Sequence, residues 1–86
     1  MTKLEEKLIE LGYEECKISH NDLKKYKKEY NDYINIYLYY DLYDKKFTNW
    51  KVKPYADIND QSVLDDLQQA YNEMEKDLEA LRNVED

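Results

Sequence analysis

The chain has few of the residue types from which small active sites are built. In 86 residues it has one glycine, one proline, one cysteine and one histidine. A single glycine excludes the glycine-rich loops that cradle phosphates, and the single Cys16 excludes an internal disulfide bond. Cys16 and His20 stand four residues apart, about 13 Å along a strand, which is too far for a Cys–His catalytic pair. Two such side chains are also too few for zinc, so we expect no enzyme, no metal and no cofactor.

Long apolar runs and a basic C-terminal third are also missing. No run approaches the roughly 18 apolar residues of a membrane span, and Met1-Thr2-Lys3 opens without an apolar signal segment, so we expect no membrane partner and a cytoplasmic location. The formal net charge is −7. Residues 1–55 carry eleven lysines against ten acidic residues, whereas residues 56–86 carry Lys76 and Arg82 against ten. The acidic end argues against contact with DNA and permits contact with a basic protein surface, although a solvated, solubilising helix face also explains it.

Tyrosine, by contrast, is abundant. The chain has ten tyrosines, and most of them fall between Tyr26 and Tyr43. Tyrosine buries a ring while keeping a hydroxyl in water, and it is enriched in protein interfaces. The sequence therefore favours a binding surface over a catalytic site.

Local patterns indicate a helix at each end of the chain. Thr2 and Glu5 form a capping-box pattern, leucines at helical spacing follow, and Gly12 is the kind of residue that ends helices, so a helix is expected over residues 3–11. A long helix is expected over residues 60–82. There, six apolar residues repeat at heptad spacing: Leu64, Leu67, Tyr71, Met74, Leu78 and Leu81.

The middle of the chain reads as strands. Alternation indicates strands over residues 13–19, 33–40 and 47–53. Residues 23–30 fit either a helical turn or a strand, and the strand is favoured because Asn31-Asp32 is a turn signal that leads into the next strand. Residues 1–86 therefore predict a single α+β domain. It is an antiparallel three- to four-stranded meander with the N-terminal helix and the long C-terminal helix packed on one face.

The alternation also gives this sheet two different faces. The apolar face, which would meet both helices, comprises Cys16, Ile18, Ile34, Ile36, Leu38, Trp50 and Val52. Thr48 is expected on the same side of its strand as Trp50 and Val52. The opposite face has no element left to cover it and comprises Tyr33, Tyr37, Tyr39, Asn49 and Lys51. We expect Tyr33, Tyr37, Tyr39 and Lys51 to anchor a protein partner. Two alternatives stay open: the tyrosines are only cross-strand pairs, or they stack unpaired bases beside the basic run Lys24–Lys28.

The long C-terminal helix carries the second group of candidate binding residues. Its acids Asp65, Asp66, Glu73 and Asp77 are expected on the outer faces, where they would steer the domain toward a partner with a basic surface. An extended acidic helix can also imitate the phosphate backbone of DNA. The heptad repeat has a further interpretation as a homodimer seam, formed by an end of the helix that overhangs the sheet: Met74, Leu78, Leu81 and Val84.

Both ends of the chain resemble a known group of proteins. Leu4-Glu5-Glu6-Lys7-Leu8-Ile9-Glu10-Leu11-Gly12-Tyr13 resembles the opening of many small proteins carried by phages and prophages of low-GC Gram-positive bacteria. The tail Asp65-Asp66-Leu67-Gln68-Gln69-Ala70-Tyr71-Asn72, followed by Asp77-Leu78, resembles their usual ending, whereas the likeness across the sheet is looser. The resemblance implies a phage accessory protein of the bacterial host cytoplasm. Small acidic phage proteins include anti-CRISPR and other anti-defence inhibitors, which bind rather than catalyse.

The sequence prediction is accordingly a non-enzymatic, phage-type protein-binding domain. By analogy with those proteins, we expect it to inhibit a host nucleic-acid-handling or defence protein. Two other interpretations are kept: nucleic-acid binding through the Lys/Tyr sheet face, and a structural or assembly role as a dimer module.

Overall fold

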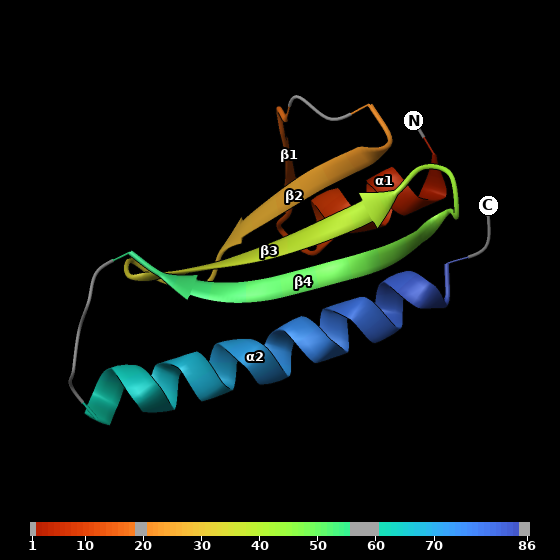
Figure 1. The fold of residues 1–86 in the computed structure, drawn as a ribbon. Coiled ribbons are helices and arrows are strands. Elements are labelled where there is room, and N and C mark those ends of the chain that lie inside the picture. The colour runs from red at the N-terminus through yellow and green to blue at the C-terminus, as the bar shows by residue number, and fades with distance from the viewer. Residues whose placement is uncertain (1, 19–20, 56–60, 85–86) are drawn as a thin grey trace.

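The sheet and the two helices follow the predicted order. The computed structural model describes residues 2–18, 21–55 and 61–84. Helix α1 comes first, four strands follow, and helix α2 comes last: α1 (Lys3–Glu10), β1 (Glu14–Cys16), β2 (Leu23–Glu29), β3 (Ile34–Asp41), β4 (Lys46–Pro54) and α2 (Gln61–Arg82). The strands form one antiparallel sheet in chain order. Figure 1 shows α2 running along the sheet, with the two ends of the chain on the same side of the molecule. The predicted α+β class is confirmed.

Helix α1 begins at the predicted residue and ends one residue earlier than predicted, at Glu10. The Thr2 hydroxyl oxygen accepts a hydrogen bond of 3.1 Å from the Glu5 backbone N–H, which caps the first turn. At the other end Gly12 adopts φ 98°, in the left-handed region. The N–H groups of Gly12 and Tyr13 then reach back to the carbonyls of Ile9 and Leu8, at 3.0 and 2.8 Å. This is the Schellman arrangement, and it delivers the Tyr13 ring into the core beside Leu8.

The ambiguous segment 23–30 is a strand, as favoured. Strand β2 pairs with β3 from Leu23 opposite Asp41 to Glu29 opposite Asn35. The connecting turn is longer than the two residues predicted, because β2 ends at Glu29 and β3 begins at Ile34. Within it the Asn31 side-chain oxygen accepts a 2.8 Å hydrogen bond from the Tyr33 N–H, and this local bond takes the place of a glycine turn.

A β-bulge changes the faces predicted for the last strand. Tyr39 stands opposite Asn49, but Tyr40 stands opposite Phe47, so Thr48 is an extra residue on β4. The extra residue reverses the alternation: Phe47 turns under the helices and is buried, whereas Thr48 is exposed. The expected placement of Thr48 on the apolar face is therefore wrong.

The first strand is shorter than predicted, and its faces are exchanged. Strand β1 covers only residues 14–16, because Tyr13 already belongs to the cap of α1. Cys16 pairs with Lys25, which places it on the face away from the helices, whereas Glu15 pairs with the buried Tyr26. The expected placement of Cys16 on the apolar face is thus wrong. Ile18 lies beyond the strand and is half-buried, and Ser19 and His20 lie outside the described residues.

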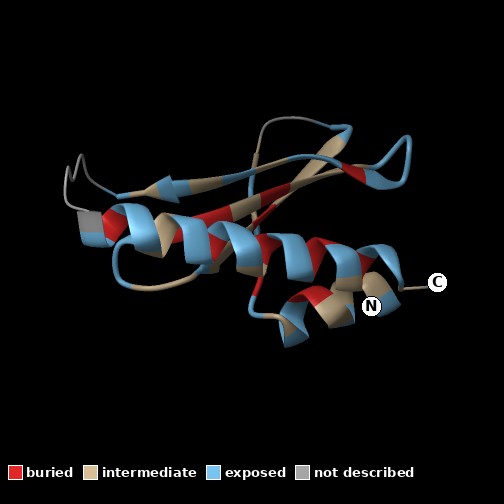
Figure 2. Ribbon diagram, turned by 90° about the horizontal axis from the view of Figure 1, so that it is seen from below, coloured by how far each residue is buried: buried red, intermediate tan, exposed pale blue. Residues whose placement is uncertain are grey.

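Helix α2 buries the C-terminal half of the predicted stripe, at Met74, Leu78 and Leu81, but not its N-terminal half. Leu64 and Tyr71 are 55% and 42% exposed. The buried side chains are Val63, Ala70, Met74, Asp77, Leu78 and Leu81, and Figure 2 shows buried positions recurring along the helix. The small Ala70, fully buried, allows the helix to lie close to the sheet, and this sets its rotation. The overhang predicted for Met74, Leu78 and Leu81 is also wrong, because these residues pack in the core of their own domain.

Candidate functional site

The sheet face that points away from the helices carries a lattice of lysine and tyrosine. Register places Lys25, Tyr39 and Asn49 in one row across the sheet, and Lys27, Tyr37 and Lys51 in the next. Side chains of directly paired residues in an antiparallel sheet point to the same side. Lys53, opposite Asn35, extends the same face. We call this surface the Lys–Tyr face: Lys25, Lys27, Tyr37, Tyr39, Asn49, Lys51 and Lys53.

Two lysines flank two tyrosine rings at the centre of this face. The Lys25 Nζ lies 4.7 Å from the ring centroid of Tyr37 and 5.8 Å from that of Tyr39. The Lys51 Nζ approaches the same two rings from the opposite strand, at 6.0 and 5.7 Å. These distances lie within the range of cation–π attraction, which holds each ammonium against a ring. The lysine heads are therefore restrained before any partner arrives.

Most of the positive charge on the Lys–Tyr face is unpaired. Within the described residues, Lys25, Lys51 and Lys53 form no ion pair; Lys27 is paired with Glu14 at 3.8 Å. Asp41, at the far end of β3, accepts hydrogen bonds from the N–H groups of the following turn instead. Register also places two exposed acids at the border of this face, Glu14 opposite Lys27 and Glu29 opposite Asn35. The lysines outnumber these acids, so the face of an acidic protein keeps an excess of positive charge around Tyr37 and Tyr39.

One end of the face is fixed by a small hydrogen-bond network. The Tyr55 hydroxyl donates to the Asn35 side-chain oxygen at 2.8 Å, and the Asn35 amide donates to the Tyr37 hydroxyl at 3.1 Å. Asn35 is only 2% exposed, because Tyr55 covers it. The side-chain amide of Asn35 in turn positions the phenol of Tyr37. Tyr33 lies outside this network. It stands 56% exposed in the turn before β3, and its backbone carbonyl accepts the Tyr55 N–H at 2.8 Å.

The free edge of β4 is unsuited to pairing with another strand. The Trp50 N–H donates to its neighbour's side chain, Asn49 Oδ1, at 2.9 Å, which removes one edge donor. Pro54 has no N–H to offer, and the bulge at Thr48 interrupts the strand. A partner is therefore better accommodated on the face of this sheet than along its edge.

The four acids predicted on α2 divide into two pairs. Asp65 is exposed and Asp66 half-buried, at the N-terminal end of the helix. Glu73 and Asp77 instead share Lys28 of β2, whose Nζ lies 3.2 Å from a Glu73 oxygen and 2.9 Å from an Asp77 oxygen. Asp77 is 6% exposed, so its expected position on the outer face is wrong. A buried carboxylate is tolerated there because Lys28 pairs with it across the core.

Tyr13 completes this internal cluster. Its hydroxyl donates to Asp77 at 3.0 Å, while the Lys28 ammonium lies 5.4 Å from the centroid of the Tyr13 ring. Burial, followed by the negative charge of Asp77, raises the pKa of Tyr13 far above its ordinary value of 10. The phenol therefore stays protonated and acts as a donor. Tyr13, Lys28 and Asp77 form a structural polar cluster that ties α1, β2 and α2 together.

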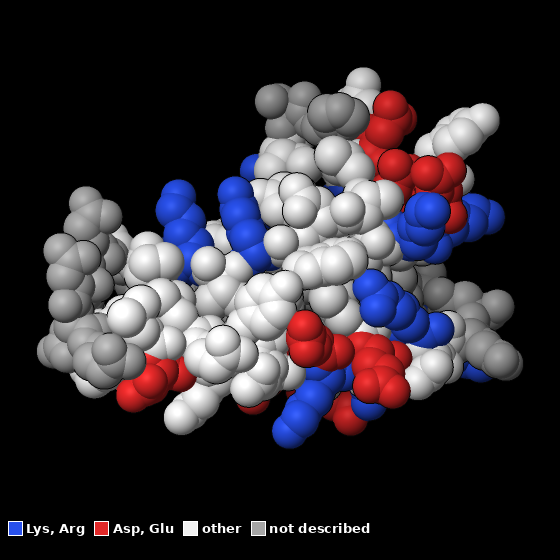
Figure 3. All heavy atoms as spheres, turned by 60° about the horizontal axis from the view of Figure 1, so that its bottom comes forward, with Lys and Arg blue, Asp and Glu red and all other residues white. Residues whose placement is uncertain are grey.

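On the side of α2, the acids that the structure describes do not form one continuous surface. Figure 3 shows the molecule from the side of α2, and the carboxylates stand in separate groups with uncharged surface between them. Because Glu73 and Asp77 are engaged by Lys28, the helix offers a broken acidic pattern. This arrangement gives less support to imitation of a phosphate backbone than the sequence suggested.

Comparisons add no functional assignment to this geometry. No group of three or more His, Cys, Asp or Glu side chains is arranged to hold a metal ion in the portion of the chain that the structure describes. None of the helices described is both long and apolar enough to cross a membrane. Comparison with models of protein families, with curated proteins and with solved structures gives no match.

Proposed function

We propose that this chain is a non-enzymatic protein-binding domain that uses its Lys–Tyr face to hold an acidic surface of a partner protein. One observation carries the proposal. Lys25 and Lys51, which form no ion pair within the described residues, are restrained against the rings of Tyr37 and Tyr39 on an uncovered sheet face. Restrained side chains lose less conformational entropy on binding than free ones. A carboxylate that reaches these ammonium groups gains a charge-assisted hydrogen bond beside an aromatic contact surface.

The proposal reverses the charge of the partner expected from the sequence. That expectation rested on four acids. Asp77 is buried against Lys28, and Glu73 is partly exposed but pairs with the same lysine. Asp65 and Asp66 remain candidates for contact with a basic surface, at the N-terminal end of α2. That the partner is a host nucleic-acid-handling or defence protein, inhibited in the manner of an anti-CRISPR protein, stays a prediction.

Single-stranded nucleic acid is the second candidate ligand for the same face. It is favoured by one observation: helix α2 carries six acids against Lys76 and Arg82 and lies on the other side of the sheet, so the acids of this helix do not face the ligand. Base stacking, however, needs open ring faces, and the ammonium groups of Lys25 and Lys51 lie over Tyr37 and Tyr39. The carboxylates of an acidic protein surface can bind those ammonium groups without moving them. We therefore favour a protein as the ligand.

An affinity pull-down with matched charge variants tests the proposal. The tagged protein is incubated with lysate of a low-GC Gram-positive bacterium, half of it treated with nuclease, and the captured proteins are identified by mass spectrometry. One bait carries Lys25→Glu and Lys51→Glu. The control bait carries Lys17→Glu and Lys76→Glu, which change the net charge equally at exposed positions outside the Lys–Tyr face.

The proposal predicts one protein captured by the wild-type and control baits, from both halves, and lost from the Lys25/Lys51 bait. Equal capture by all three baits would refute the role of the face. Loss of all capture after nuclease treatment would favour the nucleic-acid candidate instead.

A further inference from the structure

A pocket opens on the helix side of the domain, away from the Lys–Tyr face. It has a volume of about 540 Å³ and lies where α1, the β3–β4 turn and the end of α2 meet. Its floor is apolar and comes from all three regions: Leu4, Tyr40, Phe47, Leu81 and Val84. The rings of Tyr40 and Phe47 pack edge to face with centroids 5.0 Å apart. The volume lies within the range of about 300–1,000 Å³ that is typical of small-molecule sites.

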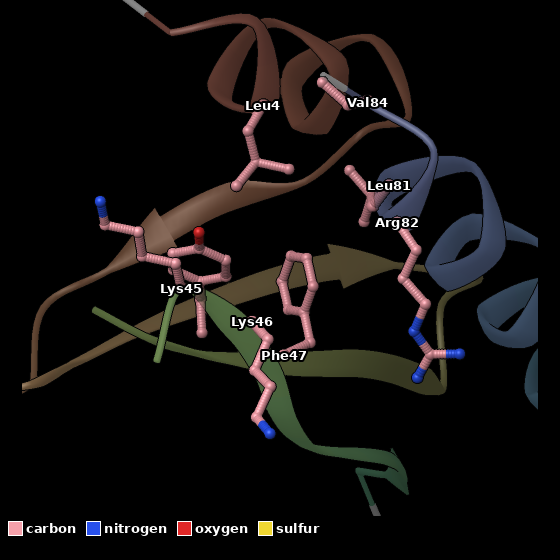
Figure 4. Close-up of a pocket in the computed structure, with 8 residues that line it drawn as sticks. Leu4, Lys45, Lys46, Phe47, Leu81, Arg82 and Val84 are labelled. Carbon is pink, nitrogen blue, oxygen red and sulfur yellow. The ribbon is translucent and has the colours of Figure 1, made fainter. Parts of the chain in front are cut away.

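The apolar side chains face one another across the pocket. Figure 4 shows Leu4, Leu81 and Val84 gathered on one side and Phe47 opposite them. After α2 the chain is held by backbone hydrogen bonds, including one of 3.3 Å from the Val84 N–H to the Leu81 carbonyl. The end of the helix thus positions Val84 as one wall of the pocket.

The border of the pocket is cationic. Lys45, Lys46 and Arg82 line it, and Figure 4 shows their nitrogen-bearing ends pointing outward from the apolar floor in different directions. In the part of the chain that is described, no carboxylate lines the pocket, and neither Lys45 nor Lys46 forms an ion pair. The Arg82 guanidinium is held 5.3 Å from the ring centroid of Trp50. Three cations and no carboxylate at one pocket are unexpected in a chain whose net charge is −7.

From this combination we infer that the pocket binds a small amphipathic carboxylate, with its hydrocarbon part on the floor of Phe47 and Leu81 and its anionic head at the border of Lys45, Lys46 and Arg82. The floor supplies apolar burial, and the border supplies charge complementarity. A cationic amphiphile of the same length would meet repulsion at that border. The site is separate from the Lys–Tyr face, so the inference stands or falls independently of the proposed partner.

Isothermal titration calorimetry with decanoate, below its micelle concentration, tests the inference. We expect saturable binding of decanoate and none of decyltrimethylammonium. The double variant Lys46→Gln/Arg82→Gln should weaken decanoate binding by about tenfold or more, because it removes two of the three border cations. Val84→Asp, which places a carboxylate in the wall, should abolish it. Lys17→Gln, at an exposed position outside both the pocket and the Lys–Tyr face, is the matched control and should leave the affinity unchanged.

Several results would overturn the inference. They are the absence of decanoate binding, equal binding of decyltrimethylammonium, or an affinity that Lys46→Gln/Arg82→Gln leaves unaltered. An equal loss in Lys25→Gln, a variant of the Lys–Tyr face, would place the binding on the sheet face instead. Co-sedimentation with phosphatidylglycerol vesicles distinguishes binding of a free acid from binding of a lipid surface. If the protein is retained on vesicles in a manner that depends on Arg82, but does not bind decanoate, a pocket for a free carboxylate would also be contradicted.

Discussion

Replacing Lys28 by methionine should destabilise the fold more than any other single lysine substitution. Lys28 is the cation of the buried cluster, 2.9 Å from Asp77 and 3.2 Å from Glu73. Methionine keeps most of the side-chain volume, so the change removes charge and leaves packing nearly intact. Among the described residues, the buried carboxylate of Asp77 would then keep only the Tyr13 hydroxyl, at 3.0 Å, as a hydrogen-bond partner.

The size of the effect follows from the burial of both ions. The side chains of Lys28 and Asp77 are 16% and 8% exposed, so little solvent reaches the carboxylate once its partner is gone. Removing one partner of a buried ion pair costs about 3–5 kcal/mol. A domain of this size has a total stability on the order of 4–13 kcal/mol, so Lys28→Met should lose a large share of it.

Urea denaturation followed by circular dichroism and by Trp50 fluorescence measures the effect. Lys53→Met is the matched control, because Lys53 is exposed on the Lys–Tyr face and should change the free energy of unfolding by less than about 0.5 kcal/mol. The double variant Lys28→Met/Asp77→Leu should recover much of the lost stability, since no buried charge is left. If Lys28→Met cost no more than Lys53→Met, the cluster would not hold α2 to the sheet.

Three further predictions concern pH and backbone conformation. Burial raises the pKa of Tyr26 to about 12 and that of Tyr13 further still, so the unfolded state, with tyrosine pKa values near 10, loses these protons first. The contribution of the two phenols should be constant well below pH 10. Stability should then fall toward pH 12 by on the order of 3 kcal/mol from Tyr26 and by a further amount from Tyr13, and unchanged urea midpoints over that range would contradict this. Lys45→Gly should raise the free energy of unfolding by about 0.5–1 kcal/mol, because Lys45 adopts φ 56°, a left-handed conformation that glycine adopts at lower cost. Thermal denaturation measures the change, and a lower melting temperature would refute the prediction. Gly12→Ala should cost about 1–2 kcal/mol in urea, because φ is 98°. The added Cβ makes only ordinary contacts with the Lys28 side chain, at 3.6–3.9 Å, so the cost comes from the backbone. A neutral effect would show that the backbone relaxes.

Elements marked by local signals could be predicted from the sequence. The capping pattern of Thr2 and the position of Gly12 fixed both ends of α1, because both act through hydrogen bonds to residues within a few positions. Strand β3 was equally clear, since its alternation of branched and aromatic residues is strict. These features depend on the neighbouring residues alone, and the rest of the fold does not override them.

Features that depend on contacts distant in sequence were missed. The rotation of α2 depends on how closely Ala70 approaches the sheet, and the burial of Asp77 depends on Lys28, 49 positions earlier in the chain. The alternation of apolar and polar residues could not predict the bulge at Thr48, because that pattern assumes that each residue of one strand pairs with one residue of the next. Lys25 was absent from the predicted site for the same reason: its place beside Tyr37 and Tyr39 follows from strand register.

The central claim is that the Lys–Tyr face is the surface that holds a protein partner. Its most direct test is an NMR titration of the ¹⁵N-labelled domain with the protein captured in the pull-down, followed through the backbone amides. Large chemical-shift changes are predicted on the central strands, at Lys25, Tyr37, Tyr39 and Lys51, with the outer side of α2 little affected. Changes confined to α2 around Asp65, with the Lys–Tyr face unperturbed, would contradict the account and restore the acidic helix as the binding surface.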